Sequence, residues 1–362
     1  EIRVSEGKQA TINRIKIYGN SRVYEDVVRR ELKLKPGDLF NMDAYKMSAQ
    51  EIQQMGHFDP EQMKFEPVSD PVNGTVDLDL GLTPKPSDQV EFSLGWGQTG
   101  VIGKIGLKFT NFSFANLFRK NDNYRGILPQ GDGQTLTISG QTNGSYYQSY
   151  SVSFFDPWFG GKRPNSFSVS AFYSVQTDIS SNYYNSAYMN NYWNYYSGYG
   201  SYYNNYYNNY ESYYDPDKSI QMYGLSLGWG KRLRWPDDYF SLSAELSFQR
   251  FILKDWSYLY IRLNNGEYMT TGSSNNLSLG LTLSRNSTDN PIFPRKGSDF
   301  SASVHVTPPY SLFSNKDYAT YGKDNYDEAA SVYNWIEYHK WKFKAKTYTA
   351  LSGAQKCPVI MT

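Results

Sequence analysis

The chain has 362 residues, with 36 Lys and Arg against 35 Asp and Glu, and a formal net charge of +1. This balance argues against a nucleic-acid-binding protein, which usually carries a strong basic excess. The single cysteine, Cys357, excludes an intrachain disulfide framework and a multi-cysteine metal site. No run of about 18 apolar residues occurs, and this excludes a transmembrane helix.

Aromatic residues are unusually frequent at 17%, with 34 Tyr and 8 Trp, although the mean hydropathy is −0.64. A polar average with many aromatic side chains is typical of a transmembrane β-barrel, because only every second strand residue faces lipid. The opening residues carry no basic or apolar leader, so a signal peptide is not expected within this chain.

Residues 9–86 predict a small α+β domain with the element order β-α-α-β-β. The expected elements are strand Ala10–Tyr18, helix Tyr24–Leu32, helix Met42–Met55, and strands Met63–Val68 and Thr75–Leu82. Asn41 is the expected N-cap of the second helix, and Asp70–Gly74 is the expected turn between the last two strands. The second helix is expected to carry apolar side chains on one face, at Met42, Tyr45, Ala49, Ile52 and Met55.

Residues 87–362 predict a transmembrane antiparallel β-barrel, with about ten or eleven strands in this chain. In each expected strand apolar residues alternate with Ser, Gly or Thr, as in Leu277–Ser284. A soluble β-sandwich also alternates and is the competing interpretation. The small polar face favours the barrel, and so do Trp residues near strand ends, because Trp gathers at membrane interfaces. These are Trp96, Trp158, Trp229 and Trp235.

Both ends of the sequence suggest a piece of a longer protein. Residues 1–8 look like the end of a preceding module of the same kind as residues 9–86. The last expected strand, Lys356–Thr362, has no following strand to pair with. An open edge in lipid costs several kcal/mol for each unpaired backbone group, so further barrel strands are expected.

Residues 180–216 form a tract rich in Tyr and Asn that lacks the aliphatic residues of a core. Such composition predicts a long external loop. The loop is either a variable surface segment or a docking surface for a partner, since Tyr offers a large contact area at low entropic cost.

Three stretches resemble the Omp85 superfamily, and within it the outer-membrane assembly proteins. Ile15–Asn20 resembles the first strand of that family's POTRA domain, and Phe154–Pro164 and Ser284–Ser298 resemble two of its barrel segments. The sequence Asp156–Gly161, together with the Tyr/Asn loop, is similar to the Bacteroidota branch.

The resemblance implies a barrel of about sixteen strands that follows several POTRA domains. This chain would hold the last POTRA domain and roughly the first two-thirds of the barrel. The resemblance also implies an outer-membrane location with the POTRA domain in the periplasm. The sequence departs from the family in lacking the Val-Arg-Gly-Phe-type motif of the inward-folding sixth loop and the closing strand, so nothing is carried over for those positions.

No residue pattern supports enzymatic chemistry, a cofactor or a catalytic metal. Gly95–Gly100 matches G-x-G-x-x-G, but strand-like alternation continues through Phe109, so glycines that thin a barrel edge are expected instead of a nucleotide site. His57, His305 and His339 fall in different elements without metal-binding spacing. A G-x-S-x-G nucleophile elbow is absent from the sequence.

Four lysines share one face of a late strand, with Trp341 and Phe343 on the other face. They are Lys340, Lys342, Lys344 and Lys346. A lysine that faces lipid at mid-membrane costs about 2–4 kcal/mol, so this row is expected to line the lumen or to lie beyond the membrane. It forms either a solvated wall balanced by acids such as Glu245, or a contact for a polyanion.

The first barrel strand is the candidate functional site. Its residues are Gln89, Val90, Glu91, Phe92, Ser93, Leu94, Gly95, Trp96 and Gly97. Its glycines should weaken packing at the seam where a barrel closes, and an exposed edge can pair with another strand through backbone hydrogen bonds. In the resembled family this seam opens laterally, and the first strand receives the C-terminal strand of a client protein.

The resemblance therefore implies a non-enzymatic insertase of the outer-membrane β-barrel assembly machinery. The implied partners are outer-membrane lipids and lipopolysaccharide, unfolded outer-membrane protein clients, and periplasmic or surface lipoproteins, the periplasmic ones docking on Met42–Met55 and the surface around it. One alternative is an Omp85-type protein-secretion transporter, and another is a passive porin or adhesion barrel. The POTRA-like domain argues against the passive pore, which needs no periplasmic strand-binding module.

Overall fold

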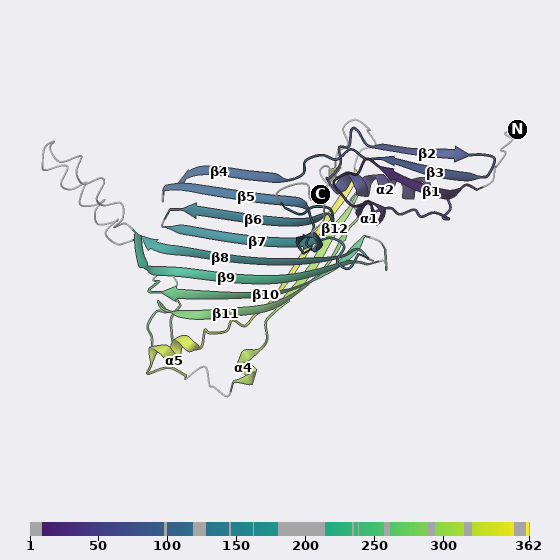
Figure 1. The fold of residues 1–362 in the computed structure, drawn as a ribbon. Coiled ribbons are helices and arrows are strands. Elements are labelled where there is room, and N and C mark those ends of the chain that lie inside the picture. The colour runs from purple at the N-terminus through teal and green to yellow at the C-terminus, as the bar shows by residue number, and fades with distance from the viewer. Residues whose placement is uncertain are drawn as a thin grey trace, which may run out of the picture. The chain divides into compact units, whose positions relative to one another are not determined.

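The computed structural model describes most of the chain (Figure 1). The described residues are 9–97, 100–118, 128–144, 146–161, 163–179, 214–233, 235–237, 239–256, 261–288, 294–314, 321–350 and 360–361. The expectations for residues 1–8, for most of the 180–216 loop and for Cys357 lie outside the described residues. The chain divides into two compact units, Glu1–Val90 with Leu107–Thr137, and Glu91–Gly106 with Ile138–Thr362.

The first unit contains the predicted α+β domain. Its elements are β1 (Thr11–Tyr18), α1 (Glu25–Arg29), α2 (Met42–Gln54), β2 (Lys64–Asp70) and β3 (Thr75–Gly81). The three strands form a sheet of order β1-β3-β2, in which β3 is parallel to β1 and antiparallel to β2. The predicted β-α-α-β-β order is confirmed.

The core of this domain is built from thirteen buried apolar residues that lie between Ile12 and Leu82. Val28, Ile52, Phe58 and Leu80 are fully buried. They come from α1, α2, the segment after α2 and β3, so both helices bury a face near the same sheet. The hydrophobic effect of this burial holds the helices and the sheet together.

The two helices differ from prediction in detail. Helix α1 ends at Arg29, because the next amides bond three residues back, from Glu31 to Val28 and from Leu32 to Arg29, instead of four. Asn41 caps α2 as predicted, with its side chain accepting from the Asp43 and Ala44 amides.

The apolar face predicted for α2 is only partly buried. Ile52 is buried, Met42 is exposed, and Ser48, which was not in the predicted set, is buried as well. The Ser48 hydroxyl donates to the Ala44 carbonyl at 2.7 Å and accepts from the Lys33 amide at 2.9 Å. A serine whose hydroxyl is satisfied in this way can be buried at little cost.

The barrel segment forms one sheet of eleven strands among the described residues, with the order β14 through β4 following the chain. The strands are β4 (Gln89–Gly97), β5 (Gly100–Phe112), β6 (Gln134–Asn143), β7 (Tyr147–Asp156), β8 (Asn165–Ile179), β9 (Tyr214–Arg232), β10 (Phe240–Lys254), β11 (Gly272–Asn286), β12 (Gly297–Val306), β13 (His339–Ala350) and β14 (Ile360–Met361). Figure 1 shows β8 to β11 side by side and β12 passing behind them, so this sheet is curved. The predicted fold class, a partial antiparallel barrel after an α+β domain, is confirmed, and the eleven strands of the described residues agree with the predicted number. Of the predicted last strand, Lys356–Thr362, only Ile360–Met361 lie within the described residues.

The registers place apolar and polar residues on opposite faces of the sheet. One continuous row across six strands consists of Trp341, Val304, Leu281, Ala244, Trp229 and Phe167. The next row consists of Lys340, His305, Gly280, Glu245, Gly228 and Ser168. The apolar residues Leu281 and Trp229 are 48% and 38% exposed, so this face of the sheet is not covered by a second layer of the described residues. A β-sandwich would bury that face against a second sheet, so the pattern fits a sheet whose apolar face meets lipid.

The helical segments after β4 are short: they are η1 (Ala115–Leu117), α4 (Tyr310–Phe313) and α5 (Tyr326–Ser331). Within the described part of the chain, every helix is too short or too polar to cross a membrane. A second small core includes Ala329 and Ala330 of α5, packed with residues of the β10–β11 connection. Its buried members are Leu253, Trp256, Leu263, Met269, Ala329 and Ala330.

Candidate functional site

The predicted templating residues form a single strand at the edge of the sheet. Strand β4 is hydrogen-bonded to β5 on one side and stands at one end of the strand order, with β14 at the other end. Its apolar side chains are strongly exposed, from 65% for Leu94 to 81% for Trp96. Among the described residues, the backbone of the outer side of β4 has no neighbouring strand. Such an edge can accept another strand in β-pairing. The templating role of these residues stays a prediction.

The glycines of this edge leave its polar face thin. A Cβ atom added at Gly95 would meet no atom within 4 Å. On the neighbouring strand, a Cβ at Gly106 would lie 3.3 Å from the Glu91 carboxylate. The glycine-rich run from Gly95 ends β4 and begins β5, which continues as a strand to Phe112, whereas a nucleotide-binding loop of this type opens a helix.

The residues directly before β4 are fixed by the end of β5 and the segment that follows it. Both Asp88 carboxylate oxygens are used, one by the Thr110 amide and one by the Gln130 side-chain amide, each at 3.2 Å. Ser87 also contacts the Thr110 hydroxyl. The entry into β4 is therefore held in place within the first compact unit.

A second set of contacts in the same unit, here called the joint, connects the chain before α1 to residues 111–133. The Asn111 side chain donates to the Arg22 carbonyl at 2.6 Å, and the Asn116 side chain donates to the Tyr24 hydroxyl at 2.6 Å. The Tyr24 amide donates to the Gly131 carbonyl at 2.9 Å. Gly131 has φ +138, and a Cβ there would come within 2.4 Å of the Tyr24 ring. The joint therefore requires glycine at this position.

His57 lies buried beside the joint, and it shares the lining of a small cavity with Arg22, Asp88 and Asn111. Its Nδ1 atom has no hydrogen-bond partner among the described residues. Burial lowers the pKa of His57, the nearby Asp88 carboxylate raises it, and the Arg30 guanidinium lowers it further. The imidazole is therefore held in its neutral form more strongly than a free histidine.

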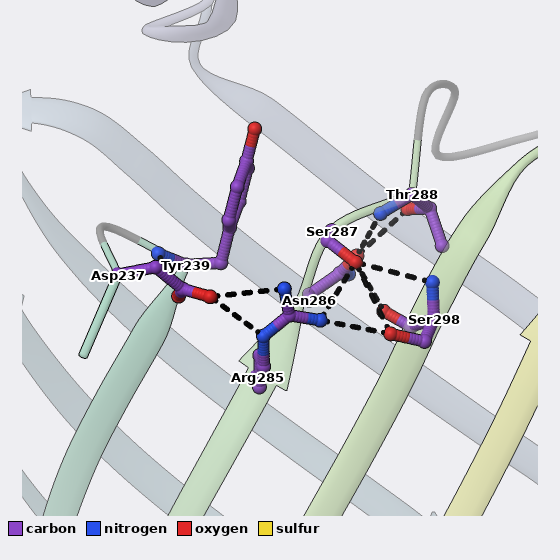
Figure 2. Close-up of polar contacts among 7 residues, drawn as sticks. All are labelled: Asp237, Tyr239, Arg285, Asn286, Ser287, Thr288 and Ser298. Carbon is purple, nitrogen blue, oxygen red and sulfur yellow. Dashed lines mark hydrogen bonds and ion pairs between the residues drawn. The ribbon is translucent and has the colours of Figure 1, made fainter.

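Arg285 in β11 joins two turns at the end of the sheet, and Figure 2 shows its guanidinium between Asp237 and two serines. Its Nε and Nη2 atoms lie 2.9 Å from one Asp237 oxygen. Its Nη1 atom donates to the Ser287 and Ser298 hydroxyls at 2.9 Å. The guanidinium carbon also lies 5.6 Å from the centre of the Tyr239 ring. The β9–β10 and β11–β12 turns are thereby fixed to each other.

The lysine row lies on β13, and its four side chains are exposed. Their cross-strand partners on the neighbouring strand β12 are Asp299, Ser301, Ser303 and His305. They share their face with Glu245, while Trp341 and Phe343 occupy the other face at 73% and 75% exposure. The arrangement agrees with a row turned away from lipid, and a lumenal role stays a prediction.

Sequence reasoning missed the joint and the role of Arg285. Local signals were present, because Gly131-Asp132-Gly133 is a turn sequence and Arg285 lies inside one of the stretches that resemble the family. Their partners, however, are distant: Asn111 and Arg22 are separated by 89 positions, and Arg285 and Asp237 by 48.

The chain matches two protein families. Residues 130–361 match the Omp85 superfamily domain, and residues 10–85 match the POTRA family, described as a surface antigen variable number repeat. The chain is 28% identical over 162 residues to the outer membrane protein assembly factor BamA of Neisseria meningitidis serogroup B, and 26% identical over 161 residues to a putative outer membrane protein assembly factor of Treponema pallidum. Each alignment covers 44% of this chain and 18% of the relative.

Two solved structures share the fold over nearly the whole chain. One is BamA from Haemophilus ducreyi lacking POTRA domains 1-3, with a TM-score of 0.52 at 16% identity. The alignment covers 96% of this chain and 53% of the BamA chain. The other is CdiB from Escherichia coli, with a TM-score of 0.54 at 10% identity. The alignment covers 95% of this chain and 52% of the CdiB chain.

The chain thus spans about half the length of these solved structures, and its aligned part is a smaller share of the curated relatives. BamA-type proteins of this family are outer-membrane proteins with periplasmic POTRA domains, and this confirms the location expected from the sequence. The Omp85 model matches more than half of the residues of this chain, and the matched part follows a POTRA domain. The chain therefore belongs to the Omp85 superfamily.

Proposed function

We propose that this chain forms the membrane-embedded core of an outer-membrane β-barrel insertase, with β4 as the strand on which client strands are assembled. The observation that carries the proposal is the place of β4 as the first strand of the sheet, together with Gly95, where an added Cβ atom would meet no other atom within 4 Å. The sequence similarity to outer membrane protein assembly factors also supports an insertase role.

The proposed reaction is non-enzymatic. A client strand would hydrogen-bond to the β4 backbone, and this pairing reads the client sequence only weakly. Free energy would come from burial of the client's apolar residues in lipid and from completion of its strand pairing. The chain would lower the barrier by offering a fixed edge, since Ser87 and Asp88 hold the entry into β4.

The proposed partners follow from the surfaces of the two units. Unfolded outer-membrane proteins would meet β4, and lipids and lipopolysaccharide would surround the apolar face of the sheet. On the POTRA domain, Met42 and Met47 of α2 are about half exposed, which suits docking of a periplasmic lipoprotein. Surface lipoproteins are a further proposed partner class.

Crosslinking of the full-length protein tests the role of β4. In a C357S background, L94C on β4 is compared with V152C on β7, which is also exposed but is paired with strands on both sides. A client whose last strand carries single cysteines should form a disulfide with L94C in one register and none with V152C. Equal crosslinking at both positions would remove the support for templating at this edge.

A protein-secretion transporter of the same superfamily is the second candidate, because the similarity to solved structures, at TM-scores of 0.52 and 0.54, supports the fold and does not separate an insertase from a transporter. Conditional depletion, followed by heat-modifiable gel mobility, discriminates between them. An insertase predicts that many unrelated outer-membrane barrels lose their folded form together. A transporter predicts that these barrels stay folded while one secreted protein accumulates in the periplasm.

A further inference from the structure

The lysine row of β13 carries positive charge that the described residues do not neutralise. Within the described part of the chain, none of Lys340, Lys342, Lys344 and Lys346 takes part in an ion pair or a side-chain hydrogen bond. Asp299 on β12 is paired directly with Lys346, so one lysine has an acid as its neighbour. The other three face Ser301, Ser303 and His305.

The next acid on this face is too distant to balance the row. Glu245 lies in the same cross-strand row as Lys340, but β12 and β11 stand between their two strands. Neighbouring strands are about 4.8 Å apart, so the two backbones are separated by about 14 Å. Glu245 therefore belongs to a different part of the polar face.

The floor beside the lysines is made of small side chains. Next to Ser301 and Ser303 on β12 lie Ser284 and Thr282 on β11. These side chains leave the strip alongside β13 open and offer hydroxyl groups for hydrogen bonding. Alternate residues of a strand are about 6.7 Å apart, so the lysines repeat at the spacing of alternate side chains in any extended polypeptide.

We propose that this row binds an extended acidic segment of polypeptide inside the barrel, with every second side chain directing a carboxylate at a lysine. The charge of the row and its repeat together define this occupant. Membrane lipid is not the expected ligand, because Trp341 and Phe343 place the lipid-compatible face on the opposite side of β13. The proposal goes beyond templating at β4, and it applies to an insertase and to a secretion transporter alike.

Peptide binding to the full-length protein in lipid nanodiscs tests the proposal. The probe is a fluorescent peptide of about twelve residues that alternates Glu and Ser, compared with its Gln and Ser counterpart. The acidic peptide should bind at least about tenfold more tightly than the neutral one. The variant K340Q/K342Q/K344Q/K346Q should weaken acidic-peptide binding by about tenfold or more, while substitution of the same four lysines by Arg should preserve binding.

The matched control removes four exposed lysines from the POTRA domain, as K16Q/K35Q/K46Q/K64Q. This variant should bind the acidic peptide like the unaltered protein. Equal weakening by the control would reduce the effect to net charge and overturn the proposal. Inorganic polyphosphate binding with the same affinity and the same dependence on the β13 lysines would overturn the assignment to polypeptide. Heat-modifiable mobility confirms folding of each variant, and the Arg variant keeps the test valid if the Gln variant misfolds.

Discussion

Arg285 shows what a single planar side chain can do at the end of a strand, because its guanidinium meets one carboxylate and two hydroxyls at the same time. R285K keeps the charge but loses the planar fork of the guanidinium, which bonds the Asp237 carboxylate on one side and two serine hydroxyls on the other. We therefore expect a loss of about 1–3 kcal/mol of stability. Denaturant unfolding in lipid vesicles, followed by Trp fluorescence, measures it. The control R250K changes an exposed residue of β10 and should cost little; equal losses would contradict the role of the fork.

Gly131 should be intolerant of any side chain for two separate reasons. Its φ of +138 disfavours other residues, and a Cβ would enter the Tyr24 ring. G37A provides the matched control, because Gly37 also has a positive φ but an open surrounding. We expect G131A to destabilise the joint by about 1–3 kcal/mol more than G37A destabilises its own turn. Hydrogen exchange at the Tyr24 amide measures the joint, and unchanged protection in G131A would refute the clash.

His57 should make the first unit sensitive to acid. Its pKa is lowered in the folded state from the ordinary value of 6.5, mainly by burial, so the unfolded chain binds the proton more tightly. The stabilisation is complete above the unfolded pKa and is lost as pH falls through the folded pKa. Exchange of β3 amides, corrected for intrinsic rates, should accelerate between about pH 7.5 and about pH 5.5. H57Q should flatten this difference, and an unaltered pH dependence in H57Q would assign it to other groups.

Residues with local causes were predictable, and residues with distant partners were not. Asn41 could be recognised as a helix cap because its hydrogen bonds reach only two and three positions along the chain. Burial of Ser48 escaped prediction, since it depends on the backbone amide of Lys33, which lies 15 positions earlier in the chain. The joint residues could not be paired from sequence, because Tyr24 and Asn116 are 92 positions apart.

At the scale of strands, alternation with a period of two predicted the faces of the sheet correctly. Leu281 lies in the apolar row, whereas Thr282 lies on the polar face opposite Ser303 and Ser243, so the registers with β12 and β10 agree with the prediction. The pairing of Lys346 with Asp299 was not predicted, because alternation fixes the face of a strand but not its register against the next one. Helix ends were less predictable than strands, as the early end of α1 illustrates.

The two faces of β11 should differ in how much an added charge lowers the stability of the barrel. L281K places an ammonium on the apolar face, and we expect a loss of about 2–4 kcal/mol if the position lies at mid-membrane depth. T282K adds the same group to the polar face and should cost close to nothing. Fraction folded in lipid vesicles, read by gel mobility, separates the two variants. Similar losses would mean that the apolar row does not face lipid.

At the scale of the whole molecule, the POTRA domain should fold when separated from the barrel. All thirteen residues of its core lie between Ile12 and Leu82. A fragment of residues 9–86 is therefore expected to unfold cooperatively, as measured by circular dichroism with denaturant. The Tyr24 amide should exchange faster in the fragment than in the full chain, because its acceptor on Gly131 is missing. A gradual, non-cooperative transition would show that the domain needs residues 107–137.

The self-contained core has a consequence for how such proteins change over generations. In the described part of the chain, the hydrogen bonds that link this region to residues 107–137 come from two short segments and not from β1. One segment is Arg22–Arg30, in and around α1, and the other is Ser87–Asp88, directly after the domain. Duplication or deletion of copies of this module further upstream would leave those two segments untouched. In a longer protein that carried further copies of this module before residue 9, a change in their number would therefore need no compensating substitution in those two segments.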